Sequence, residues 1–160
     1  MPTSRRRRAS SRRPRRHRWP SAQRADAVVA DVFISYARHD GEFVRALHAF
    51  LTESGRDVWV DWEHLPWASR WEQEINAAID MAGSVVFVVS SSSLASEHCL
   101  AELRYAHERG KQIVPLASYG ADPLAAPESL RQLNWIWCRT RDDRAVAFAA
   151  LVTALESDPE

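Results

Sequence analysis

The sequence is poor in the residues on which several classes of protein depend. It has only two cysteines, Cys99 and Cys138, in 160 residues, which is too few for a disulfide framework and lacks the spacing of a zinc site. Such sparse use of cysteine is typical of reducing compartments, so we expect a cytoplasmic protein. The five glycines form neither the G-x-G-x-x-G fingerprint nor a P-loop. Their positions argue against a Rossmann dehydrogenase and against a P-loop nucleotidase.

Long apolar runs are also missing. The longest one in a predicted strand, Val85–Val89, is far shorter than the roughly 20 residues that cross a bilayer. No apolar segment follows the basic N-terminus, so we predict no signal peptide. The histidines are scattered without the spacing of metal ligands, and we expect no metal site.

Acidic residues are missing from the first part of the chain. Residues 1–24 contain ten arginines and no acidic residue, a charge of +10. The whole chain has 21 Lys+Arg and 21 Asp+Glu, so residues 25–160 carry 11 basic and 21 acidic residues, a charge of −10. We predict a disordered Arg-rich tail over residues 1–28 and one folded domain over residues 29–157.

Two interpretations of this tail stay open. Its arginines could neutralise the phosphates of nucleic acid or of an anionic membrane. Alternatively, the tail is simply solvated, or it is not translated because cells do not use this upstream start codon. The second interpretation is favoured, because Trp19 is the only aromatic residue in it that could stack on a base.

Beyond residue 30, short β-rich apolar segments alternate with amphipathic ones. Five of the former have the pattern of buried parallel strands: Asp31–Tyr36, Asp57–Asp61, Ser84–Ser90, Gln112–Leu116 and Asn134–Cys138. Helices are predicted between them, and a last helix begins at Asp142. Alternating strands and helices favour right-handed βαβ units. We therefore predict an α/β fold, a flavodoxin-like doubly wound five-stranded parallel sheet with helices on both faces.

Single residues indicate where these elements begin and end. Asp40 is the predicted cap of the first helix, and Gly55 and Gly83 are predicted to end the first and second helices. The serines up to Ser93 are expected to form a loop. Pro115 is expected to mark the end of the fourth strand, because proline cannot donate to a sheet.

In such a fold, ligands bind at the carboxyl ends of the strands, beside the point where the strand order reverses. The residues at the predicted strand ends include an arginine that could bind phosphate, aromatic rings that could stack on a base, and carboxylates. They are Ser35, Tyr36 and Arg38 at the first strand, and Asp61, Trp62 and Glu63 at the second. The third strand is followed by serines and then by the predicted helix that contains Glu102. A phosphoacceptor receiver domain has the same fold. It needs an acidic pair after the first strand and a lysine after the fourth, and this sequence has neither.

Three segments, in order, resemble the Toll/interleukin-1 receptor/resistance (TIR) domain. DVFISY (31–36) resembles its first box, and GRDVWVD (55–61) resembles its second strand and the start of its BB loop. SLASEHCLAEL (93–103) resembles the S-x-W-C-x-x-E-L segment of bacterial and plant members. The resemblance covers about residues 30–155. The BB-loop tripeptide typical of animal receptors is not evident, which favours a bacterial-type member.

The resemblance implies one of two functions. Some TIR domains cleave NAD+ at the nicotinamide–ribose bond, with NAD+ as a substrate and with no cofactor. Others are non-catalytic scaffolds that act by TIR–TIR contacts. Either function implies self-association, with other TIR or sensor proteins as partners, in bacterial immune or antiphage signalling. A third interpretation is a nucleotide-cleaving enzyme of another flavodoxin-like family.

The residues of the NAD+ site are also implied by the resemblance. By motif position, Glu102 is the candidate catalytic carboxylate, and the alternative is a helix-surface glutamate paired with Arg109 or Arg38. His98 stands where many relatives have tryptophan, and Cys99 is expected to be a core residue. The candidate substrate-binding residues are Ser35, Tyr36, Arg38, Trp62, Glu63, Trp67, Ser90 and His98.

Overall fold

The computed structural model describes residues 30–62, 69–118 and 120–157. The predicted tail, residues 1–28, lies outside the described residues, as do the candidate site residues Glu63 and Trp67. Within the described part of the chain, no helix is long and apolar enough to span a membrane.

Five parallel strands form one sheet in the order β2-β1-β3-β4-β5. The strands are β1 (Ala30–Ser35), β2 (Val58–Val60), β3 (Ala82–Val89), β4 (Gln112–Ala117) and β5 (Ile136–Trp137). This is the flavodoxin-like order, in which the direction of winding reverses between β1 and β3. The predicted fold class is therefore confirmed.

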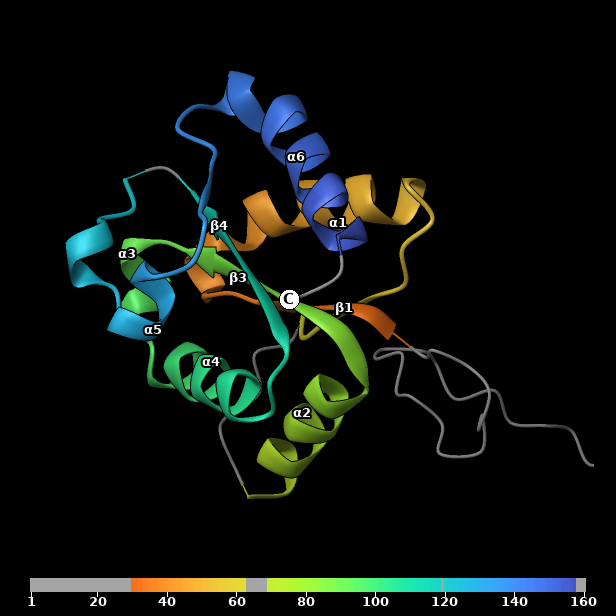
Figure 1. The fold of residues 1–160 in the computed structure, drawn as a ribbon, viewed down its shortest axis with the longest axis vertical. Coiled ribbons are helices and arrows are strands. Elements are labelled where there is room, and N and C mark those ends of the chain that lie inside the picture. Colours follow the sequence, from red (N-terminus) through yellow and green to blue (C-terminus); the bar gives the residue numbers. More distant parts are fainter. Residues whose placement is uncertain (1–29, 63–68, 119, 158–160) are drawn as a thin grey trace, which may run out of the picture.

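Helices cover both faces of the sheet. Figure 1 shows α1 and α6 on one side of it and α2 and α4 on the other. The helices are α1 (Gly41–Glu53), α2 (Ser69–Met81), α3 (Ser91–Leu94), α4 (Glu97–Glu108), α5 (Glu128–Arg131) and α6 (Arg144–Glu156), with short 3-10 turns η1 (Arg38–Asp40), η2 (Pro123–Ala125) and η3 (Arg141–Asp143).

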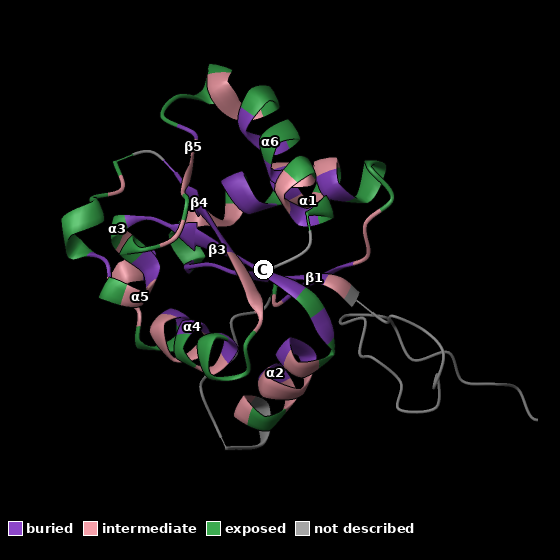
Figure 2. Cartoon of the chain, in the orientation of Figure 1, coloured by how far each residue is buried: buried purple, intermediate pink, exposed green. Residues whose placement is uncertain are grey.

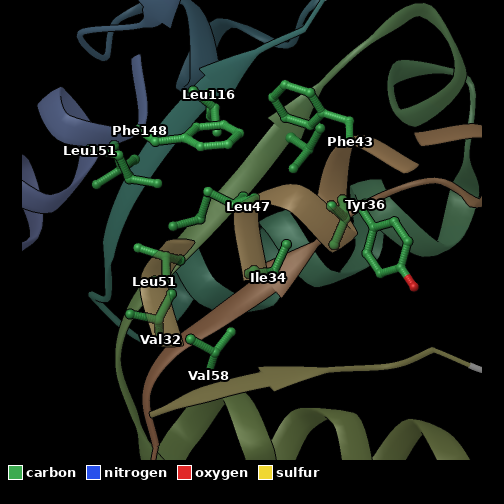
Figure 3. Close-up of a cluster of buried hydrophobic side chains, with 14 of the residues drawn as sticks. Val32, Ile34, Tyr36, Phe43, Leu47, Leu51, Val58, Leu116, Phe148 and Leu151 are labelled. Carbon is green, nitrogen blue, oxygen red and sulfur yellow. The ribbon is translucent and has the colours of Figure 1, made fainter. Parts of the chain in front are cut away.

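Alternation along β1 divides the core into two layers. Val32 and Ile34 pack in the layer of α1 and α6, which Figure 3 shows in close-up. Phe33 points to the other layer, where its ring stacks on Trp59 with the centroids 4.9 Å apart. Each large side chain buried in this way contributes about 1.5–3 kcal/mol. The strands are mostly buried and the outer faces of the helices exposed (Figure 2), so the sheet is a rigid support for its carboxyl edge.

Two local expectations, for the end of the second helix and for the serine run, were wrong. The second helix ends at Met81 instead of Gly83, and β3 follows at once. Gly83 lies inside β3, where a Cβ would stand 3.3 Å from the Asp31 carbonyl oxygen, so glycine allows this close approach of β1. The serine run forms the short helix α3 instead of a loop.

Pro115 does not end the fourth strand. It pairs with Phe87 of β3, and β4 continues to Ala117. On the other side, β5 pairs with β4 only at Leu116 and Ala117. Pro115 therefore has a strand neighbour on one side only, which is where a sheet tolerates a residue without an N–H.

Candidate functional site

A cavity of about 530 Å³ opens at the carboxyl ends of β1 and β2, on the side of the sheet covered by α2 and α4. Its described lining comes from the end of β1, η1, the residue after β2, one residue of α2, and the segment from α3 to α4. The cavity lies beside the reversal of strand order, where doubly wound folds bind ligands. Its volume is in the range of sites for small molecules and nucleotides.

Glu102 enters this cavity from the second turn of α4. The helix begins at Glu97 because the Ser96 hydroxyl accepts a hydrogen bond from the Cys99 amide at 3.3 Å. Helical spacing then places Cys99, Leu103 and Ala106 in the core, with Glu102 at the edge of this buried stripe. The candidate catalytic carboxyl is thus held on a packed helix and faces the cavity.

The surroundings of Glu102 disfavour its charged form. Its side chain is half-buried and the cavity wall encloses it, and burial is the largest cause that raises its pKa, to about 8. The charge of Asp61 raises this pKa further, and the Ser35 hydroxyl lowers it. The expected alternative partner Arg109 instead binds Asp80 at 2.8 Å.

Ser35 ends β1 on the α4 side of the sheet and is fully buried. Its Oγ has no hydrogen-bond partner of standard geometry among the described residues. The hydroxyl nevertheless lies near enough to Glu102 to lower the pKa of that carboxyl. A buried polar group of this kind is unusual.

Tyr36 fixes the chain that follows β2. Its hydroxyl donates to the backbone oxygen of Asp61 at 2.7 Å, and Figure 3 shows this hydroxyl directed away from the apolar cluster. Burial, followed by the charge of Asp61, raises the pKa of Tyr36, so the phenol stays protonated. Tyr36 is also one of the residues that line the cavity.

Trp62 packs away from the described cavity wall. Its ring meets Tyr36 edge-on at 6.2 Å and His48 of α1 at 5.3 Å, and 38% of the residue is exposed. It is not among the described lining residues. Burial lowers the pKa of His48, so this contact joins a neutral imidazole to an indole. A substrate contact for Trp62 stays a prediction.

Ser90 is occupied by structural hydrogen bonds. Its hydroxyl caps α3 by accepting from the Ser93 amide at 3.0 Å, and it donates to the Asp40 carboxylate. Asp40 was the predicted cap of α1, but it makes no side-chain cap bond and reaches across to Ser90 instead. This hydrogen bond joins the loop after β1 to the loop after β3. A direct role of Ser90 toward substrate stays a prediction.

The rim of the cavity carries basic side chains. Arg38 and His39 come from η1 and His98 from the first turn of α4, and all three are exposed. Guanidinium and imidazolium groups are donors that bind anions. Arg38 and His98 were expected at the site, whereas His39 was not.

Of the candidate residues, the structure brings Tyr36, Arg38, His98 and Glu102 together in the cavity wall, with Ser35 buried behind it. Asp61 also lines the cavity, although it was named only as a strand-end residue. Its position directly after β2 was the signal that could have added it to the site.

Cys99 is a core residue, as expected, and burial raises its pKa to about 12. A thiol that stays protonated at physiological pH is a poor nucleophile. Within residues 30–62, 69–118 and 120–157, no three His, Cys, Asp or Glu side chains are grouped so as to hold a metal ion.

Solved structures similar to this chain share its fold. The TIR domain of the Toll-related receptor TRR-2 from Hydra magnipapillata is 22% identical, with a TM-score of 0.66, over 80% of this chain and 99% of that one. The TIR domains of the activated Roq1 resistosome, which directly recognises the effector XopQ, are 21% identical, with a TM-score of 0.63, over 79% and 99%. The CMP N-glycosidase BcmB of Clostridium botulinum is 16% identical, with a TM-score of 0.56, over 77% and 98%.

A comparison with curated proteins found no match. The family model of the TIR domain matches residues 32–152, which is most of the chain and includes every described residue of the cavity wall. On this match, the chain belongs to the TIR domain family.

Proposed function

We propose that this TIR domain cleaves the bond between nicotinamide and ribose in NAD+, and that Glu102 is its catalytic residue. The observation that carries the proposal is the position of Glu102. The carboxyl of the third TIR-like motif faces a cavity of about 530 Å³ at the switch point of the sheet. A scaffold that only binds other TIR domains would not need a half-buried carboxyl in such a cavity.

The polar groups of the cavity suit the parts of NAD+. The basic rim, with Arg38 and His98, would meet the diphosphate, and Glu102 would lie beside the ribose next to nicotinamide. Tyr36 forms part of the inner wall, and the buried Ser35 lies behind that wall. The neighbouring structure of a CMP N-glycosidase indicates that a fold of this shape can host N-glycoside cleavage.

The reaction needs no general acid for the leaving group. The electron pair of the C1′–N bond goes to the pyridinium nitrogen, so nicotinamide leaves neutral. Positive charge then spreads over C1′ and the ring oxygen of the ribose, and the Glu102 carboxylate stabilises this charge. Water adds at C1′ and loses one proton, which gives ADP-ribose. Attack by a nitrogen of adenine in place of water would give a cyclised product.

We further propose that activity depends on self-association. The active site would be completed when subunits associate, so activity per subunit should rise with protein concentration. Other TIR or sensor proteins are the expected partners, in bacterial immune signalling.

The test is chromatography of NAD+ and its products after incubation with the full chain, over a series of protein concentrations. Wild type should release nicotinamide, and Glu102→Gln should not, because the amide keeps the size of the side chain without its charge. Glu108→Gln is the matched control, since Glu108 lies exposed at the end of the same helix.

Two results would contradict the proposal. If wild type consumed no NAD+ at any protein concentration, the proposed enzymatic function would be refuted and a non-catalytic scaffold would be favoured. If Glu102→Gln consumed NAD+ as fast as wild type, Glu102 would not be the catalytic residue. Size-exclusion chromatography of the same samples would show whether self-association survives in the variant.

A further inference from the structure

Two segments that are distant in sequence form much of the cavity wall. The first is the turn after β1, where η1 contributes Arg38 and His39. The second leads from α3 into α4 and contributes Ser92, Ser96 and His98. Both segments lie beyond the ends of their strands, so strand pairing does not hold one against the other. The shape of the cavity therefore depends on contacts between the two segments.

A side-chain hydrogen bond joins these two segments just behind the wall. The hydroxyl of Ser90, the residue before α3, donates to the carboxylate of Asp40, the last residue of η1. Asp40 is not among the described lining residues, but its charge helps to raise the pKa of the Cys99 thiol, which does line the cavity. Only 4% of Ser90 is exposed, and Asp40 is half-buried. The bond is thus largely shielded from water, where a hydrogen bond to a carboxylate is strong.

The Ser90 hydroxyl is oriented by its own surroundings. Its oxygen accepts from the Ser93 amide at 3.0 Å, and the Ser90 amide donates to the Ser93 hydroxyl at 2.9 Å. This reciprocal capping box fixes Ser90 at the start of α3. Because the hydroxyl oxygen serves as an acceptor for the helix, its proton is given to Asp40. The bond to Asp40 therefore starts from a rigid point on the second segment.

Asp40 makes this bond in place of a more usual one. An aspartate directly before a helix normally accepts a hydrogen bond from an amide in the first turn of that helix. Asp40 directly precedes α1 but makes no such side-chain bond. Its backbone amide donates to the Ala37 oxygen at 2.9 Å, which closes η1. The backbone of Asp40 thus shapes η1, and its side chain ties η1 to α3.

We propose that Asp40 is a positioning residue for substrate binding, which through Ser90 holds η1 against α3 and so sets the spacing across the cavity between the η1 side chains and the wall formed by α3 and α4. The inference rests on the proposed function, because it assigns part of the substrate affinity of that site to a residue behind its wall. Glu102 is held separately, by the buried stripe of α4. Loss of the bond should therefore weaken binding and leave the cleavage step nearly unchanged.

The first test replaces Asp40 by alanine in the full chain, which removes the acceptor. KM for NAD+ should rise about tenfold, while kcat per folded subunit stays within about twofold of wild type. ADP-ribose has the diphosphate but no bond to nicotinamide, so its Kd can be measured by isothermal titration calorimetry without turnover. This Kd should rise by the same factor as KM. A purely structural role would lower the folded fraction, seen by circular dichroism, and the apparent kcat, but neither KM nor Kd.

Two further variants isolate the hydrogen bond itself. Asp40→Asn keeps a side-chain oxygen that can accept from Ser90, so KM and Kd should return to within about threefold of wild type. Combining Asp40→Ala with Ser90→Ala should raise KM no further than Ser90→Ala alone, because the same bond is lost only once. Asp142→Ala is the matched control. Asp142 is an exposed aspartate in η3, the turn that leads into α6 as η1 leads into α1.

The outcomes separate the two proposals. An unchanged KM and Kd in a folded Asp40→Ala protein that still cleaves NAD+ would overturn the role of Asp40 and leave the proposed function intact. An increase that Asp40→Asn does not reverse would overturn this role too, as would a double variant whose effect is the product of the single effects. Binding of ADP-ribose that depends on Asp40, without any cleavage of NAD+, would support the inference and refute the proposed function. Absence of both ADP-ribose binding and NAD+ cleavage in wild type would overturn both.

Discussion

Replacing Glu102 by glutamine should stabilise the folded protein, by an amount that depends on pH. In the unfolded chain this carboxyl ionises near its ordinary pKa of 4.5, whereas the folded state keeps it protonated up to about pH 8. Between these values the folded state binds one more proton than the unfolded state. The stability of the wild type therefore falls as pH rises through this window, and it falls no further above the folded pKa.

The magnitude follows from the width of the window. Each pH unit corresponds to about 1.4 kcal/mol, so the whole window sets an upper limit of roughly 5 kcal/mol. The side chain is half-buried and lies in an open cavity, so water reduces the effect, and we expect about 2–3 kcal/mol. Glutamine is neutral at every pH and lacks this cost. Its variant should match the wild type near pH 4 and exceed it by that amount above pH 8.

The assay is urea unfolding of both proteins at pH 4, 6, 7, 8 and 9, followed by tryptophan fluorescence. Glu108→Gln, at an exposed position on the last turn of α4, should differ from wild type by the same small amount at every pH. A Glu102→Gln difference that does not grow with pH would refute the reasoning, and so would a less stable variant at pH 9. Either result would mean that Glu102 is not held in a desolvated place.

Tyr36→Phe removes the hydrogen bond to the Asp61 backbone oxygen, so urea unfolding should show a loss of about 1 kcal/mol and NAD+ kinetics a higher KM. Ser90→Ala removes both the cap of α3 and the donor to Asp40, and thermal unfolding should show a loss of about 1–3 kcal/mol. Arg38→Gln removes a cation from the exposed rim of the cavity, so KM for NAD+ should rise and its dependence on salt should weaken, with unfolding within about 0.5 kcal/mol of wild type.

The architecture could be predicted because it depends on patterns that are local in sequence. All five strands and the long helices were predicted close to where they lie. Apolar strands that alternate with amphipathic helices bury their apolar surfaces when the strands form a parallel sheet with helices on both faces. The errors occur where the local structure is determined by a segment that is distant in sequence but close in space. Gly83 belongs to a strand because β1 passes close to it, and Pro115 is tolerated because β5 is short. Neither neighbour is visible in the local sequence.

The candidate site shows the same division between local and distant information. Glu102 was identified because its motif is one continuous segment, residues 93–103, and Tyr36 and Arg38 because they come just after a strand. The partners of polar side chains were harder to predict. Asp40 makes its hydrogen bond with Ser90, fifty residues away, instead of capping its own helix. Trp62 packs on His48 of α1, and no motif predicts that contact.

The meeting of two acidic residues in the cavity also depends on contacts between segments that are distant in sequence. Asp61 and Glu102 are 41 positions apart, and only the pairing of β2 with β1 and the packing of α4 bring their carboxylates to one cavity. The repulsion between them opposes folding, so the fold must hold them there by other means. The Tyr36 hydrogen bond fixes the chain after β2, and the buried stripe of α4 fixes Glu102. Loosening either support should let the two acids separate and lower the pKa of Glu102, so the stability of these supports and the ionisation of the site are physically coupled.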